Sequence, residues 1–173
     1  LGVYGFFGAG IYGFSGTIKL GQKTLVSDGT IVVNADDTWV VTVNIVNFDL
    51  NGLTITEGTL VAGTGATQYT LTGLVDFPGG VTIQVTGEWA PGPSYSLEAG
   101  LAPDTEWQPL PGLDLAFTTL EGSVTKPNNQ APLIVALSAT SEASIDLVKG
   151  VALTGVSVSA NLQLGKWTVN LGG

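Results

Sequence analysis

Apolar and polar residues alternate with a period of two along most of the chain from residue 38 onward. The stretch VTIQVTGEW (81–89) places its apolar residues at odd positions and its polar residues at even ones, and YSLEAGL (95–101) repeats the scheme. Successive side chains of a β-strand point to opposite faces, so this pattern is typical of strands with one buried face. No stretch of useful length shows the periodicity of an amphipathic helix.

The same alternation predicts strands along the rest of the chain, and turn residues separate them. The predicted strands cover 30–34, 39–50, 53–61, 69–77, 81–89, 95–101, 113–124, 132–140, 143–148, 151–164 and 167–171. Glycine, proline, asparagine and aspartate gather between them and predict turns, among them SDG (27–29), NADD (34–37), Asn51-Gly52, APGP (90–93) and KPNNQ (126–130). Both Asp28-Gly29 and Asn51-Gly52 are interpreted as turns.

These strands predict an all-β protein built from antiparallel sheets that are packed on one side. Threonine and serine line the polar faces, and the strands recur about every dozen residues, so the expected closure is a β-sandwich or jelly roll. Within 39–50 the alternation changes phase near Val46, and Phe48 and Leu50 become the apolar positions. This change predicts a bulge, or a bend at which the strand passes from one sheet to another. The expected organisation is one sandwich domain over 19–173, preceded by an extended apolar strand at 1–18.

The first 18 residues, LGVYGFFGAGIYGFSGTI, contain no charge, no proline and six glycines. A transmembrane helix is one interpretation, but the segment is barely long enough, and each glycine would cost a helix about 1 kcal/mol. A retained signal peptide is another, but the segment lacks the basic region that such peptides begin with. An extended strand agrees better with the alternation of bulky and small residues.

The N-terminal strand has two candidate partners. It completes the sheet of its own chain, as N-terminal strands commonly do, or it pairs with the sheet of a neighbouring subunit, where its large side chains fill pockets. Donated strands of the second kind are apolar, extended, uncharged and terminal, and head-to-tail contacts of this type grow into fibres. The candidate interface residues are Val3, Tyr4, Phe6, Phe7, Ile11, Tyr12 and Phe14.

Composition and charge narrow the classes of function. The chain has 173 residues, of which 44% are hydrophobic and 11% charged, and its net charge is -9. Nucleic acid and anionic membrane surfaces are therefore not expected partners, because both are bound by basic patches. Cysteine and histidine are absent, which excludes histidine- or cysteine-dependent catalysis and the soft-ligand metal sites. The chain begins with leucine, so we expect export to the cell surface after removal of an N-terminal signal, although a fragment of a longer chain would begin in the same way.

Carboxylates and aromatic residues occur together in one region, the mixture found where sugars bind or are cleaved. The carboxylates are Glu88, Glu98, Asp104 and Glu106, and the aromatic residues are Trp89, Tyr95 and Trp107. In the simpler interpretation, Glu88 and Glu98 alternate onto the solvent face of strands, and the other two acids lie in a loop. We therefore expect no glycosidase, and keep the three aromatic residues as a candidate ligand patch.

One short acidic segment is a weak candidate for calcium. Asn34, Asp36 and Asp37 offer the oxygen ligands that Ca²⁺ prefers, but the full series of ligands that a calcium loop supplies is missing. A plain hairpin turn is favoured at this position, and no cofactor is expected.

Together these features predict a non-enzymatic structural protein. The expected function is that of a subunit of an extracellular filament, pilus-like fibre or surface array, whose partners are copies of itself joined by exchange of the N-terminal strand. The alternative is a monomeric glycan- or lipid-binding β-sandwich module of a larger exported protein.

Overall fold

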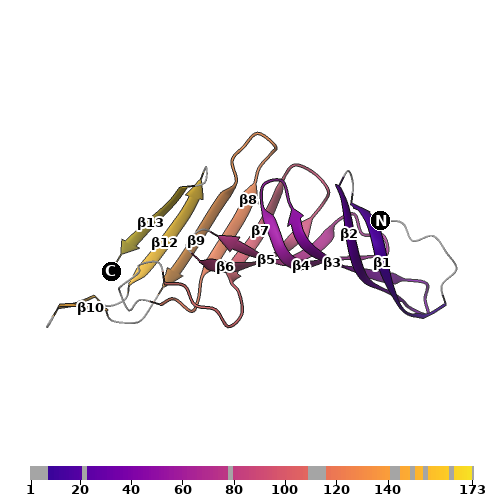
Figure 1. The fold of residues 1–173 in the computed structure, drawn as a ribbon, viewed down its shortest axis with the longest axis horizontal. Coiled ribbons are helices and arrows are strands. Elements are labelled where there is room, and N and C mark those ends of the chain that lie inside the picture. Colours follow the sequence, from indigo (N-terminus) through magenta and orange to yellow (C-terminus); the bar gives the residue numbers. More distant parts are fainter. Residues whose placement is uncertain are drawn as a thin grey trace.

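The computed structural model describes residues 8–20, 23–77, 80–108, 116–140, 145–148, 151–153, 156–163 and 166–172. Over these residues the protein is built from β-strands and connecting turns (Figure 1). The strands are β1 (Gly10–Leu20), β2 (Lys23–Val33), β3 (Trp39–Asp49), β4 (Thr54–Gly63), β5 (Tyr69–Phe77), β6 (Val81–Trp89), β7 (Tyr95–Leu101), β8 (Glu121–Lys126), β9 (Ile134–Thr140), β10 (Ile145–Val148), β11 (Val151–Leu153), β12 (Ser157–Gln163) and β13 (Lys166–Gly172).

The strands pair almost entirely in chain order. One 11-stranded sheet has the order β1-β2-β3-β4-β5-β6-β7-β8-β9-β12-β13, and β10 pairs with β11 separately. Every ladder between the described strands is antiparallel, so the predicted all-β, antiparallel class is confirmed. The sheet is open, with β1 and β13 at its two edges (Figure 1). A sandwich or jelly-roll arrangement is not confirmed by this architecture.

The sheet curls so that its concave face encloses the core. The ring of Phe48 on β3 lies 5.7 Å from the ring of Trp89 on β6, although β4 and β5 separate these strands in the sheet. The turn after β3 reaches the loop after β6, where Asn51 Nδ2 donates a hydrogen bond to the carbonyl of Gly92 at 2.7 Å. One sheet therefore covers its own apolar face across the curl.

Two glycines allow the curl by removing side chains from one row of the sheet. Gly58 on β4 pairs with Ile45 on β3 and with Gly73 on β5, and Gly73 pairs with Val85 on β6. A Cβ atom on Gly58 would lie 2.7 Å from the Cα of Gly73, a separation that carbon atoms do not tolerate without backbone movement. The backbones of β4 and β5 approach each other closely only because both residues lack a side chain.

The change of phase in β3 occurs where the sequence predicts it. Buried side chains occupy Val43 and Ile45, two adjacent exposed residues follow, and burial resumes at Phe48. The residue at the reversal is Asn47, whose left-handed φ of 50° is among the conformations that asparagine tolerates better than most residues. The register with β4 continues unchanged through this point. The predicted change of phase is therefore confirmed, but β3 contains no bulge and does not pass to another sheet, because the left-handed residue reverses the burial phase without an inserted residue.

The two predicted turns built on glycine have different outcomes. Asn51-Gly52 forms a two-residue hairpin turn, with φ values of 52° and 98°, so this prediction is confirmed. Asp28-Gly29 is not a turn, because both residues lie inside β2, which begins at Lys23. Gly29 is paired with Phe14 of β1, and a Cβ atom there would lie 2.6 Å from the Phe14 ring and overlap the carbonyl of Thr42. The glycine is required by this close packing.

Candidate functional site

The first candidate site is the N-terminal edge of the sheet. β1 pairs with β2 of the same chain over its whole length, from Gly10 opposite Val33 to Leu20 opposite Lys23. Within the described part of the chain, no strand pairs with the other edge of β1. This edge contains no proline, and its first charged residue is Lys19. Proteins usually protect such edges with proline, lysine or a bulge, so β1 is an 11-residue edge with little protection.

The residues predicted for a donated strand fall into two groups. Val3, Tyr4, Phe6 and Phe7 lie outside the described residues. Ile11, Tyr12 and Phe14 lie on β1, where Ile11 points outward with 75% of its surface exposed and the other two side chains are half-buried. The structure thus places residues 10–18 at the edge of their own sheet, and not in its middle.

Exposed apolar side chains gather next to this edge. Among the described residues, the large hydrophobic side chains that stay exposed are Ile11, Val26, Val40 and Val46, on β1, β2 and β3. Ile11 pairs with Val32, and Val32 pairs with Val40, so Ile11 and Val40 lie on the same convex face of the sheet. Val26 and Val46 lie an even number of residues from Val32 and Val40 on the same strands and share this face. We call the convex surface of these three strands the outer face of β1–β3. Apolar side chains gathered on one face are typical of a surface that contacts another molecule.

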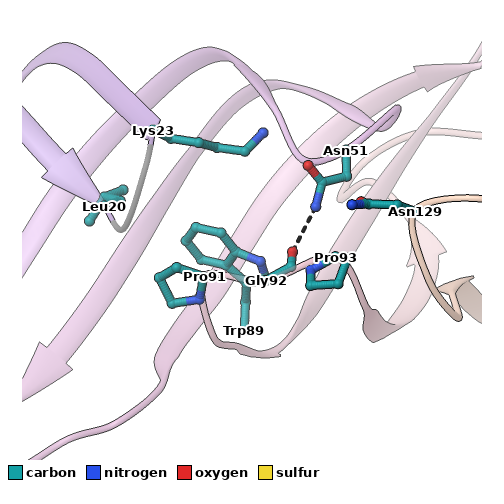
Figure 2. Close-up of a pocket in the computed structure, with 8 residues that line it drawn as sticks. All are labelled: Leu20, Lys23, Asn51, Trp89, Pro91, Gly92, Pro93 and Asn129. Atoms are coloured by element: carbon teal, nitrogen blue, oxygen red, sulfur yellow. Dashed lines mark hydrogen bonds between the residues drawn. The ribbon is translucent and has the colours of Figure 1, made fainter.

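The second candidate site is a pocket where turns from distant parts of the chain meet. Its volume is about 400 Å³, and Figure 2 shows the residues around it. The hairpin of β1 and β2 contributes Leu20 and Lys23, and the turn after β3 contributes Asn51. The remaining lining residues are Trp89, Pro91, Gly92, Pro93 and Asn129. Of all these residues, the sequence singles out Trp89 alone, because the others resemble ordinary turn residues.

An ion pair lies at one side of this pocket. Lys23 Nζ lies 3.2 Å from Asp49 Oδ2, donates to the Asp49 carbonyl, and lies 5.4 Å from the centre of the Phe48 ring. Partial burial alone would raise the pKa of the Asp49 carboxyl, but the hydrogen bonds from Gly52 and Lys23 hold it below its ordinary value. The positive charge at the pocket is therefore balanced by a carboxylate that stays ionised at neutral pH.

Two buried polar atoms, one on the pocket residue Trp89 and one on Tyr95, have no partner among the described residues. The Trp89 side chain is 1% exposed and packs against Phe48 and Tyr69, yet its indole Nε1 has no hydrogen-bond acceptor. The hydroxyl of Tyr95, at the start of β7, also has no partner among the described residues. Burial, with a contribution from the negative charge of Asp49, raises the pKa of Tyr95 above its ordinary value. Unpaired buried polar atoms are uncommon in proteins, so these two mark the region as unusual.

The aromatic residues of the predicted ligand patch all lie in the core. Trp89, Tyr95 and Trp107 are each buried. Trp107 exchanges two backbone hydrogen bonds of 2.9 Å with Phe117, and their rings lie 6.1 Å apart. Of the three, Trp89 lines the pocket. The patch is therefore not a set of exposed rings.

The acidic candidates are placed on the surface. Glu88 and Glu98 are exposed on β6 and β7, as the simpler interpretation predicts, and Asp104 and Glu106 are exposed after β7. Within the part of the chain that the structure describes, no three acidic side chains gather into a site for a metal ion.

The NADD segment forms the turn between β2 and β3. Asp36 Oδ1 accepts hydrogen bonds from the backbone NH of Thr38 at 3.2 Å and from its hydroxyl at 2.6 Å. These bonds hold the pKa of Asp36 below its ordinary value. Asn34 donates to the same Thr38 hydroxyl at 2.8 Å, and Asp37 adopts a left-handed φ of 63°. The segment is thus a hairpin turn, as favoured from the sequence, and one Asp36 oxygen is already occupied in it.

Comparisons with known proteins assign neither site. No protein-family model matches it, and no curated protein and no solved structure matches it either, so function is inferred from the edge and the pocket alone. Over the described residues, no helix has the length and apolar character needed to cross a bilayer.

Proposed function

We propose that this chain is a non-enzymatic structural subunit of an extracellular filament, pilus-like fibre or surface array, and that copies join by exchanging β1. The observation that carries the proposal is the character of this strand. It is the first strand of the sheet in chain order, it occupies the sheet edge, and it is uncharged up to Lys19. In the assembled form, β1 of one copy would pair with β2 of the next copy in the register that it has here with its own β2.

Exchange of this kind retains the contacts that the single chain already makes. Ile18 and Leu20 at the end of β1 are buried in the core, and the half-buried Phe14 packs over Gly29. A strand from a neighbour would supply the same side chains to the same places, so exchange changes the covalent connection and little else. The interface would bury on the order of 1,000 Å², which is enough for a stable contact between proteins.

The outer face of β1–β3 provides a second surface for assembly. Ile11 and Val26 are 75% and 84% exposed there, and a neighbour seated on this face would remove both from water. The predicted sandwich is part of the same proposal. The sheet is open in the single chain, and a neighbouring copy packed on this face would supply the second layer of a sandwich.

A disulfide lock tests the exchange directly. Thr17 on β1 and Val26 on β2 are paired and exposed, and the natural chain contains no cysteine that would interfere. The T17C/V26C variant carries two cysteines at facing positions of neighbouring strands, and such positions have the separation that a disulfide requires. Oxidation of the monomer should tie β1 to its own β2 and prevent assembly, as seen by size-exclusion chromatography and negative-stain microscopy. Reduction should restore assembly.

The same variant distinguishes exchange from other modes of growth. Oxidation of polymers assembled in reductant should link neighbouring chains and give a ladder of covalent multimers on a non-reducing gel. The control is T70C/E88C, whose positions are paired across β5 and β6 inside the sheet. This pair should give intramolecular disulfides only and leave assembly unchanged. Polymers that form equally well from the oxidised T17C/V26C monomer would refute strand exchange, and a chain that stays monomeric when reduced would favour the alternative of a binding module.

A further inference from the structure

The pocket is bounded by residues from distant parts of the chain. Its walls come from the hairpin of β1 and β2, the turn after β3, the loop after β6 and the loop after β8. The hydrogen bond from Asn51 to Gly92 closes one side, and Figure 2 shows the indole of Trp89 between Lys23 and Pro91 in that view. A volume of about 400 Å³ lies within the range of pockets that hold small molecules in proteins. The space is large enough for a small ligand with defined polar contacts.

The polar groups of the pocket supply both donors and acceptors. Trp89 lines the pocket, but its Nε1 is buried away from the pocket surface and is not counted among these groups. The amide of Asn51 uses its nitrogen on Gly92, so its oxygen faces the pocket region as an acceptor. The amide of Asn129 provides one donor group and one acceptor, and Figure 2 shows it directed toward Asn51. Hydroxyl groups act as donors and acceptors at once, so a hydroxyl-rich ligand matches this mixture.

The charge of the pocket argues against an anionic ligand. Among the described residues that line it, the one cation is Lys23, which is already paired with Asp49 at 3.2 Å. A phosphate or sulfate group is typically held by unpaired basic side chains or by backbone NH groups at a helix N-terminus, and the chain as a whole carries a net charge of -9. Leu20, Pro91 and Pro93 add apolar surface. A neutral ligand with both hydroxyl groups and C–H faces fits these walls.

We infer that this pocket is a binding site for a neutral carbohydrate of the size of a mono- or disaccharide, in which the Asn51 oxygen and the Asn129 amide contact its hydroxyl groups and Trp89 forms part of the wall. The inference goes beyond the proposed assembly and does not require it. Binding is tested on the oxidised, monomeric T17C/V26C chain, so that failure of one proposal leaves the other standing.

The indole NMR signal of Trp89 reports on changes in the environment of a residue that lines the pocket. The chain has 4 tryptophans, so a ¹⁵N-labelled sample gives few indole signals, and that of Trp89 is assigned from W89F or, if that variant does not fold, from its contacts with the Phe48 ring. Glucose, maltose, cellobiose and lactose are titrated one at a time to about 100 mM, which detects Kd values in the millimolar range. Sodium phosphate and sodium sulfate form the anionic arm of the experiment.

The expected result is a saturable shift of the Trp89 indole signal with at least one of the sugars and none with the anions. N129A should weaken that binding at least tenfold. N44A removes an amide from the exposed face of β3 and should leave it unchanged. The inference is overturned if no sugar shifts the signal, if an anion shifts it at lower concentration than every sugar, or if N129A binds as well as N44A.

Discussion

Replacement of Gly29 by alanine should loosen the N-terminal hairpin and destabilise the protein. A Cβ atom at position 29 would overlap the carbonyl oxygen of Thr42 and would lie 2.6 Å and 3.0 Å from two ring atoms of Phe14. The Phe14 ring is half-buried, and its contact involves a side chain and not the backbone. The carbonyl belongs to the backbone of β3, so β2 and β3 must separate there. We therefore expect the backbone contact to account for most of the effect.

The magnitude follows from comparison with a matched substitution in the same hairpin. Steric overlap of this kind costs about 1 to 3 kcal/mol, while any glycine-to-alanine change gains about 0.4 to 1 kcal/mol by restricting the unfolded chain. At Gly13 on β1, a Cβ atom would have no neighbouring atom within 4 Å, so G13A keeps the gain without the overlap. G29A should therefore be less stable than G13A by about 2 kcal/mol, because the unfolded-state gain is common to both variants.

Thermal and urea unfolding measure this difference. For a chain of this size a loss of 1 kcal/mol lowers Tm by about 2 to 4 °C, so G29A should melt about 4 to 8 °C below G13A. Adding F14A to G29A removes the ring contact and leaves the overlap with Thr42, so it should not restore stability. Equal stability of G29A and G13A, or full recovery in F14A/G29A, would refute the packing described here.

Further predictions concern the turn after β3 and the groups around the pocket. N51A should be less stable in urea than N51G by about 0.5 to 1 kcal/mol, because both lose the bond to Gly92 and only glycine adopts the left-handed conformation freely; equal stability would contradict this. D49N should be less stable than the natural chain by under about 1 kcal/mol at neutral pH. This difference in the free energy of unfolding should disappear in urea titrations below about pH 4. The pKa of Asp49 is lower in the folded chain than in the unfolded chain, so its carboxylate stabilises the fold only at pH values above its unfolded-state pKa. Y95F should be as stable as the natural chain or up to about 1 kcal/mol more stable, because the Tyr95 hydroxyl has no partner among the described residues. The raised pKa of Tyr95 predicts that the natural chain loses stability above about pH 10 and that Y95F loses less. An equal loss of unfolding free energy in the two chains above about pH 10 would contradict this prediction.

The strands can be predicted from the sequence wherever one face is buried and turn residues follow directly. β5, β6 and β7 have the predicted bounds of 69–77, 81–89 and 95–101. The first half of β2 escapes prediction, since Asp28-Gly29 is locally typical of a turn. What makes Gly29 a strand residue is Phe14 across the hairpin, and such a contact between strands leaves no periodic signal in either one.

Closure of the sheet and the candidate site are less accessible to prediction. Alternation shows that one face is buried, but it does not show what covers that face, and the close approach at Gly58 and Gly73 lets a single sheet cover itself. The pocket escapes prediction for a related reason. Asn51 and Asn129 are each typical of turns, and only the curl brings them near Trp89.

The pairing of strands in chain order has a consequence for how the protein reaches its native state. From β1 to β9 each ladder joins consecutive strands, so most of these pairings close only a short loop and lose little chain entropy, with residues 102–120 between β7 and β8 as the exception. The sheet is thus able to grow hairpin by hairpin from either end, without the long-range searches that make many β-proteins slow to fold. The contact between Phe48 and Trp89 spans two intervening strands, and we expect that final meeting to limit the folding rate.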